Sequence, residues 1–247
     1  MRMFPSTPSI LVVLVCLLPL VGCEQVPEEG AKLSIDDGWA AVQQAHADLD
    51  AKRAQLAALP EDGEGEGEGE PTPRQTLEAE LDVQSRAFSD QLVDFINGSG
   101  MVEGEPLNEI QQAAIRLKSS EDILVAEQYI TSRANYNRAI EIYNGALMLD
   151  PDNEALTTAL AHAESMRYMT KERFAAATEG MSEAQVTAAI GVVKPGNVND
   201  YRPEGKGVVA WFYPKEDGGV AGVWFKESGG VLRVFQLLWD QPSKSKS

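Results

Sequence analysis

The stretch ANYNRAIEIYNGALMLDPDN, residues 134–153, predicts a closely packed helix and decides the fold in the middle of the chain. Ala139 and Ala146 lie seven residues apart, so both small side chains fall on one face of a helix. Small residues let a neighbouring helix approach, and Tyr143 fills the space between the two helices. Pro151 stops the helix, because proline cannot continue its hydrogen-bond ladder. We therefore expect helices packed tightly around this segment.

The same stretch resembles the second helix of a tetratricopeptide repeat. Five positions at the family's spacings carry the resemblance: Tyr136, Ala139, Tyr143, Ala146 and Pro151. It covers one repeat, from about residue 120 to 153, which a following helix to about 168 would cap. The resemblance implies a partner-docking side on the first helix of the repeat, formed by Glu121, Leu124, Gln128 and Thr131. The alternative is an ordinary helix pair with similar packing of small residues.

Two more helices are predicted upstream, as an antiparallel hairpin over residues 36–98. The first begins at a cap, Asp36 or Asp37, and runs to about 59, and the second covers 74–96, each with apolar residues at 3–4 spacing. Glycine alternates with glutamate in the connection, residues 60–73, which favours a solvated, disordered loop over an acidic calcium- or partner-binding tract. After a glycine-rich hinge, helical periodicity fills a tetratricopeptide-like region over 105–170.

The C-terminal part, residues 171–241, has a different pattern and predicts a small α+β domain, followed by a tail over 242–247. Ser182 is placed to cap a short helix whose inward residues are Val186 and Ile190, and Gly191 ends it. Strand-like runs follow at 208–213, 220–226 and 231–239, separated by turn sequences. We expect a three-stranded antiparallel sheet, and an α+β fold class for the whole chain.

This C-terminal segment resembles the SmpA/OmlA-type fold, found in small lipoproteins of outer-membrane β-barrel assembly. The motifs that carry the resemblance are GMSE (180–183), Val186, IG (190–191), WFY (211–213) and VWF (223–225). The link between the helix and the first strand, VVKP (192–195), is longer than is usual in that family. The resemblance implies a role in assembling or maintaining the outer membrane. The chain also resembles uncharacterised envelope proteins that pair tetratricopeptide helices with such a domain.

The N-terminus reads as a lipoprotein signal peptide over residues 1–22. One arginine precedes an apolar run that is shorter than the roughly 20 residues a spanning helix needs. LVGC (20–23) resembles the lipobox of bacterial lipoproteins, which implies that Cys23 carries acyl chains such as palmitate and heads a tether over 23–35. Glu24 is compatible with sorting to the outer membrane, facing the periplasm. The alternative is a plain signal peptide with Cys23 incidental.

Charge and residue types exclude several function classes. The chain of 247 residues has a formal net charge of −17, which argues against a nucleic-acid partner. Its two histidines, His46 and His162, lie on separate predicted helices, so no zinc site is expected. A calcium loop at 150–155 lacks the required glycine, because Ala155 occupies that position. We expect no catalytic residue, no metal and no cofactor.

Two functional hypotheses remain. The first is a lipid-anchored scaffold or adaptor that binds a protein partner through its helices and its sheet. The second is a periplasmic binder of a small molecule or peptidoglycan fragment through the C-terminal domain. Both could use Trp211, Tyr213 and Trp224 as exposed aromatic contacts, although the pattern favours a place for these residues in the core of a small α+β domain. The two hypotheses differ in whether these aromatics line a cleft or pack against the short helix.

Overall fold

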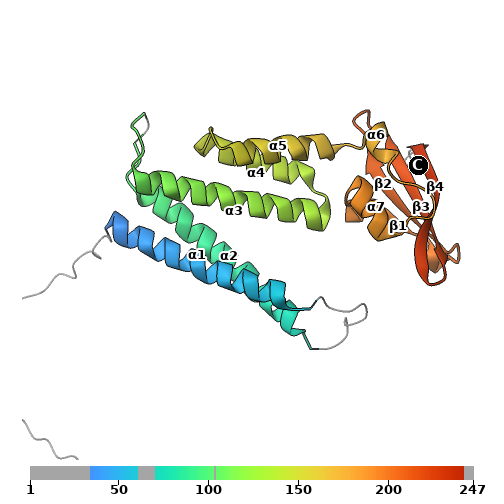
Figure 1. The fold of residues 1–247 in the computed structure, drawn as a ribbon, viewed down its shortest axis with the longest axis horizontal. Coiled ribbons are helices and arrows are strands. Elements are labelled where there is room, and N and C mark those ends of the chain that lie inside the picture. The colour runs from blue at the N-terminus through green and yellow to red at the C-terminus, as the bar shows by residue number, and fades with distance from the viewer. Residues whose placement is uncertain (1–33, 61–69, 103, 242–247) are drawn as a thin grey trace, which may run out of the picture. The chain divides into compact units, whose positions relative to one another are not determined.

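A computed structural model describes residues 34–60, 70–102 and 104–241 (Figure 1). The expected signal peptide, Cys23, most of the tether, the centre of the Glu/Gly loop and the tail lie outside the described residues. The described part combines helices with a four-stranded antiparallel sheet, which confirms the α+β class.

Helices α1 (Ile35–Ala58) and α2 (Pro73–Gly98) pack along each other (Figure 1). Helix α1 begins one residue before the expected caps, so Asp36 and Asp37 lie in its first turn. Thr72 caps α2, and its side chain and that of Gln75 each bond the other's backbone N–H. The buried residues between the helices include Val42, Leu49, Phe88, Leu92 and Ile96, joined by Ala114 of the next helix.

Helix α3 (Glu109–Arg133) continues past residue 120, where the first helix of the expected repeat would begin. It ends at Ala134, whose left-handed backbone allows the reversal into α4 (Tyr136–Leu149), and α5 (Glu154–Arg167) follows. The core of these three helices is made of small residues around one aromatic ring and one leucine: Ala126, Ala139, Tyr143, Ala146, Leu156 and Ala163. Tyr143 is 1% exposed, because the alanines on both sides let the helices close over its ring.

The C-terminal sheet has four strands in the order β1-β2-β3-β4, one more than expected. Strands β2 (Val208–Pro214), β3 (Val220–Ser228) and β4 (Val231–Gln241) occupy the predicted runs. The extra strand, β1 (Val198–Asp200), pairs with β2 inside a stretch of turn residues. Three residues are too few to show an alternating pattern, so the sequence offered no strand signal there. A short helix before the expected one, α6 (Lys171–Phe174), was also not foreseen.

One face of this sheet packs against α7 (Glu183–Ile190) and α6 (Figure 1). The capping box of α7 joins Ser182 and Gln185, and Val186 and Ile190 are buried as expected. Alternate residues of the strands fill the same core, among them Trp211, Tyr213, Val223 and Phe225. Gly191 ends the helix with a φ of 96°, a conformation that glycine adopts without strain.

A candidate partner-binding groove

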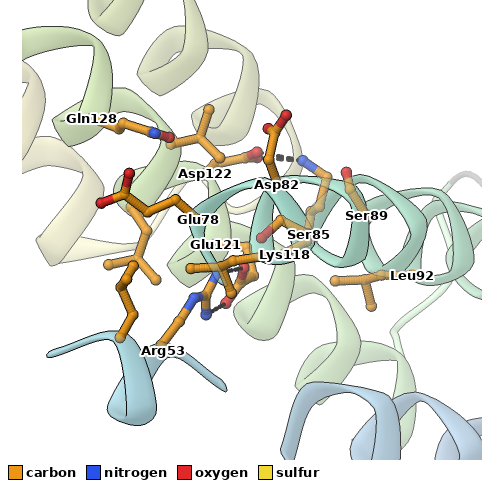
Figure 2. A pocket seen from close by; sticks show the side chains of 14 residues that line it. Arg53, Glu78, Asp82, Ser85, Ser89, Leu92, Lys118, Glu121, Asp122 and Gln128 are labelled. Carbon is orange, nitrogen blue, oxygen red and sulfur yellow. Dashed lines mark hydrogen bonds and ion pairs between the residues drawn. The ribbon is translucent and has the colours of Figure 1, made fainter. Parts of the chain in front are cut away.

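A groove lies between α1, α2 and α3, beside the α1–α2 core, and we call it the α2–α3 groove (Figure 2). Its accessible volume is about 470 Å³. The lining residues are Arg53 and Leu56 of α1, Glu78, Leu81, Asp82, Ser85, Ser89 and Leu92 of α2, and Lys118, Glu121, Asp122, Leu124, Val125 and Gln128 of α3.

The groove exists because α3 serves two different cores. Its first half places Ala114 and Leu117 against α1 and α2, whereas Ala126 and Ile130 of its second half pack with α4 and α5. Along its second half, α3 therefore has one face in the second core and the adjacent face free. Residues three and four apart on a helix share a face, which is why Glu121, Leu124 and Gln128 line the groove together.

The α1 end of the groove is closed by an ion pair between Arg53 and Glu121. Nη1 of Arg53 donates to Oε1 of Glu121 at 2.9 Å and Nη2 donates to Oε2 at 2.7 Å, the paired geometry that suits a guanidinium and a carboxylate. The hydrogen bonds from Arg53 to Glu121 raise the pKa of Arg53, although partial burial opposes the shift. Glu121 is 12% exposed, and His46 Nε2 lies 3.3 Å from its Oε1.

The α3 wall combines a second ion pair with an apolar strip. Lys118 Nζ donates to Asp122 Oδ2 at 2.6 Å within the same helix. Leu124 is 45% exposed and Val125 is 42% exposed, although each lies in the middle of a long helix. Exposed aliphatic side chains are ordinary singly, but two adjacent ones beside a groove form an apolar surface.

The α2 wall is polar and acidic. Glu78 and Asp82 form ion pairs with Arg74 and Arg86, each four residues away on the same helix. The Arg86–Asp82 pair is open to solvent, whereas Arg74 is 23% exposed and also donates to the Leu59 carbonyl oxygen. Ser85 and Ser89 continue this wall one and two turns further on. Their small side chains keep the groove open, since larger residues at these positions would fill it.

A second hollow, with an accessible volume of about 620 Å³, extends the groove toward the C-terminus of α3. It shares Asp82, Ser85, Ser89, Val125 and Gln128 with the first hollow. It adds Arg86 from α2 and Tyr129, Ser132 and Arg133 from α3. Together the two hollows follow α3 from Lys118 to Arg133.

Three of the four residues predicted as a docking side lie in the groove: Glu121, Leu124 and Gln128. The fourth, Thr131, does not line it, and its hydroxyl donates to the Glu127 carbonyl oxygen at 2.9 Å. The α2 wall and Val125 were not predicted from the sequence. The local sequence signal for the α2 wall is a pair of serines four residues apart, Ser85 and Ser89, which share a helix face. It does not predict the groove, because α2 and α3 are distant in the sequence.

The predicted aromatic contacts divide between core and surface. Trp211 and Tyr213 are 7% and 5% exposed and pack with α7, so they do not present a binding surface. The hydroxyl of Tyr213 donates to the Gly191 carbonyl oxygen at 3.1 Å, and burial raises the pKa of Tyr213. Trp224 lies on the opposite face of the sheet, half-buried, with Tyr201 and Phe212 beside it at centroid distances of 6.0 Å. Trp211 and Tyr213 therefore belong to a packed core, and Tyr213 borders a small hollow beside Arg173.

Among the described residues, no group of three or more histidine, cysteine, aspartate or glutamate side chains could hold a metal ion. The acidic turn at 150–153 has a structural use, since Asp150 accepts hydrogen bonds from Ser119 and Asn153. Within the same described ranges, none of the helices is long and apolar enough to span a membrane.

No family model matches the chain, and no similar curated protein or solved structure was found. The resemblances to tetratricopeptide and SmpA/OmlA-type proteins therefore support proposals only. The groove is the feature of the described residues that bears most directly on function.

Proposed function

We propose that this protein is a lipid-anchored envelope adaptor that binds a protein partner in the α2–α3 groove. The observation that carries the proposal is the free apolar strip of Leu124 and Val125 beside a groove that three helices line. A monomer gains nothing by leaving these aliphatic side chains in water, whereas a partner that covers them gains burial free energy.

The proposed anchor is a lipid on Cys23, which would hold the protein at the outer membrane on its periplasmic side. The sequence supports this through the short apolar leader and the small residue, Gly22, before the cysteine. Two or more acyl chains give stable anchoring without a spanning helix. The proposal assigns the chain no catalysis and no cofactor, and includes outer-membrane assembly or maintenance as the process served.

The other hypothesis, a small-molecule site in the C-terminal domain, has less support. Trp211 and Tyr213 are committed to the core. The hollow beside Tyr213 and Arg173 has an accessible volume of only about 50 Å³, far below the 300 Å³ or more of typical ligand pockets.

Site-specific photo-crosslinking in intact envelopes tests the adaptor proposal. A benzophenone amino acid is placed at Val125 in the groove, or at Met148 on α4, which is 86% exposed and outside the groove. We expect one discrete protein adduct from position 125 and none from 148. The adduct from 125 should also weaken when Leu124→Asp is added, because the apolar contact is lost.

Equal labelling from both positions, or no protein adduct from 125, would contradict the proposal. The anchor is tested separately with Cys23→Ser, which should leave the precursor unprocessed and without a lipid. Mass spectrometry of the native N-terminal peptide reads this out directly, and an unmodified Cys23 in the wild-type protein would remove the anchor.

A further inference from the structure

We infer that the occupant of the α2–α3 groove is an amphipathic helix of the partner, carrying basic residues beside its apolar face. This inference deepens the proposed function and rests on it. It commits to one chemical class of partner, and it rests on the length, the apolar strip and the charges of the groove.

The length of the groove suits a helix. Its lining runs along α2 from Glu78 to Leu92 and, through the second hollow, along α3 from Lys118 to Arg133. At 1.5 Å per residue, either wall is about 20 Å long, which matches three to four turns of a docked helix.

The two walls differ in polarity. On α3, Leu124 and Val125 form the apolar strip, and the partly buried Leu81 of α2 also lines the groove. The rim of the α2 wall carries Glu78 and Asp82 (Figure 2). A helix that buries apolar residues on the α3 side must therefore place polar residues toward α2.

The charges select a basic helix. The lining of the first hollow holds four carboxylates and two cations. Both cations, Arg53 and Lys118, are already paired with Glu121 and Asp122 inside the groove.

Asp82 is paired with Arg86, and both side chains are more than half exposed, so this pair contributes little and an incoming cation can compete for it. Glu78 is paired with Arg74, which is 23% exposed and also donates to the Leu59 carbonyl oxygen, but the Glu78 carboxylate itself is 48% exposed and can accept a further cation.

The excess of negative charge is confined to the end of the groove near Glu78. The second hollow adds Arg86 and Arg133, so it does not attract cations in the same way. We therefore expect the basic residues of the partner to lie opposite Glu78 and Asp82. The net charge of −17 would also speed the approach of a basic partner at low salt.

A second copy of this chain fits less well. Each copy carries a formal net charge of −17, and like charges on two copies oppose their association. Self-association is thus an outcome that the experiment must be able to detect.

The test uses the full-length protein in nanodiscs of a zwitterionic lipid, with empty nanodiscs subtracted. Two labelled helical peptides of about 15 residues are compared, one built from leucine and lysine and the other from leucine and glutamate at the same positions. Fluorescence anisotropy should give at least about tenfold tighter binding of the lysine peptide, with affinity falling as salt rises.

Variants locate the binding. Glu78→Lys combined with Asp82→Lys should weaken the lysine peptide about tenfold. The matched control, Asp90→Lys combined with Asp94→Lys, reverses two exposed charges at the same spacing on the same helix outside the groove and should leave the affinity within about twofold. Leu124→Ala combined with Val125→Ala should weaken binding while keeping the salt dependence.

Equal binding of the two peptides, preference for the glutamate peptide, or concentration-dependent self-association without peptide would each overturn the inference. If that happens while the crosslink from Val125 persists, the adaptor function stands and only the class of partner is wrong. Loss of the crosslink as well would remove both.

Discussion

Glu121 ties α1 to α3, since its carboxylate accepts two hydrogen bonds from Arg53 and lies beside His46. It was singled out in the sequence as a docking residue. In the structure it also closes one end of the groove, where its mostly buried charge is compensated within the chain. In the proposed complex it would therefore act indirectly, through the shape of the groove.

We expect Glu121→Gln to lower the free energy of unfolding by about 1–2 kcal/mol. The guanidinium of Arg53 would stay partly buried but would lose the carboxylate that neutralises most of its charge. Urea unfolding followed by circular dichroism measures this. Glu141→Gln serves as the control, because its pair with Arg138 is exposed and local to α4, and we expect a change below about 0.5 kcal/mol. Equal effects of the two changes would show that the Arg53–Glu121 pair adds nothing.

Single residues were predictable where the signal is local. The cap at Ser182, the inward Val186 and the stop at Gly191 follow from a few neighbouring residues, and the structure has all three. Trp211, Tyr213 and Trp224 looked alike in the sequence, because all three lie in strand patterns. Only the pairing of the strands, which puts Trp211 and Tyr213 on the α7 side and Trp224 on the other, decides their surroundings.

Among the elements, α4 shows most directly how sequence dictates packing. The face formed by Ala139, Tyr143 and Ala146 is buried, as the spacing predicts. Gly145 lies on the same helix, and a side chain added there would meet no atom within 4 Å. We therefore expect a larger side chain to destabilise the protein at the buried Ala139 and to be tolerated at the exposed Gly145.

We expect Ala139→Leu to destabilise the protein by about 1–3 kcal/mol, because the added carbons must displace closely packed neighbours. Gly145→Ala should instead stabilise it by about 0.5–1 kcal/mol, since alanine favours the helix and finds open space. Thermal unfolding of the two variants checks both signs. A tolerant response at Ala139 would mean that the three helices pack loosely in solution.

Element existence was easier to predict than element pairing. Long periodic stretches revealed the helices α1, α2, α4 and α5 to within a few residues. The α2 wall of the groove could not be predicted from the sequence. No pattern within residues 73–98 indicates which distant helix lies opposite Ser85 and Ser89. Strand β1 was not predicted for a different reason. It is defined by its hydrogen bonds to β2, and its own side chains show no strand pattern.

For the whole molecule, the C-terminal core is nearly complete in itself. Its buried residues come from 169 onward, and the backbone N–H of Met169 donates to the Pro214 carbonyl oxygen at 2.8 Å. Met169 is 3% exposed and lies two residues before the boundary expected at 171.

A fragment of residues 169–247 should therefore fold with a β-rich far-UV spectrum, and one starting at 171 should be less stable by about 2 kcal/mol for loss of the methionine. Urea titration of the two fragments measures the difference. If both fragments are unfolded, the helical region supplies part of this core. If they are equally stable, the contribution of Met169 is overestimated.

Helix α3 is one uninterrupted rod of 25 residues that belongs to both helical cores. A change in the orientation of α3 would therefore affect the packing of both cores. Tilting its second half to widen the groove would also move α4 and α5, because their alanines and Tyr143 pack against that half. In the proposed complex, the packing around Tyr143 would therefore limit how far the groove can widen around its occupant.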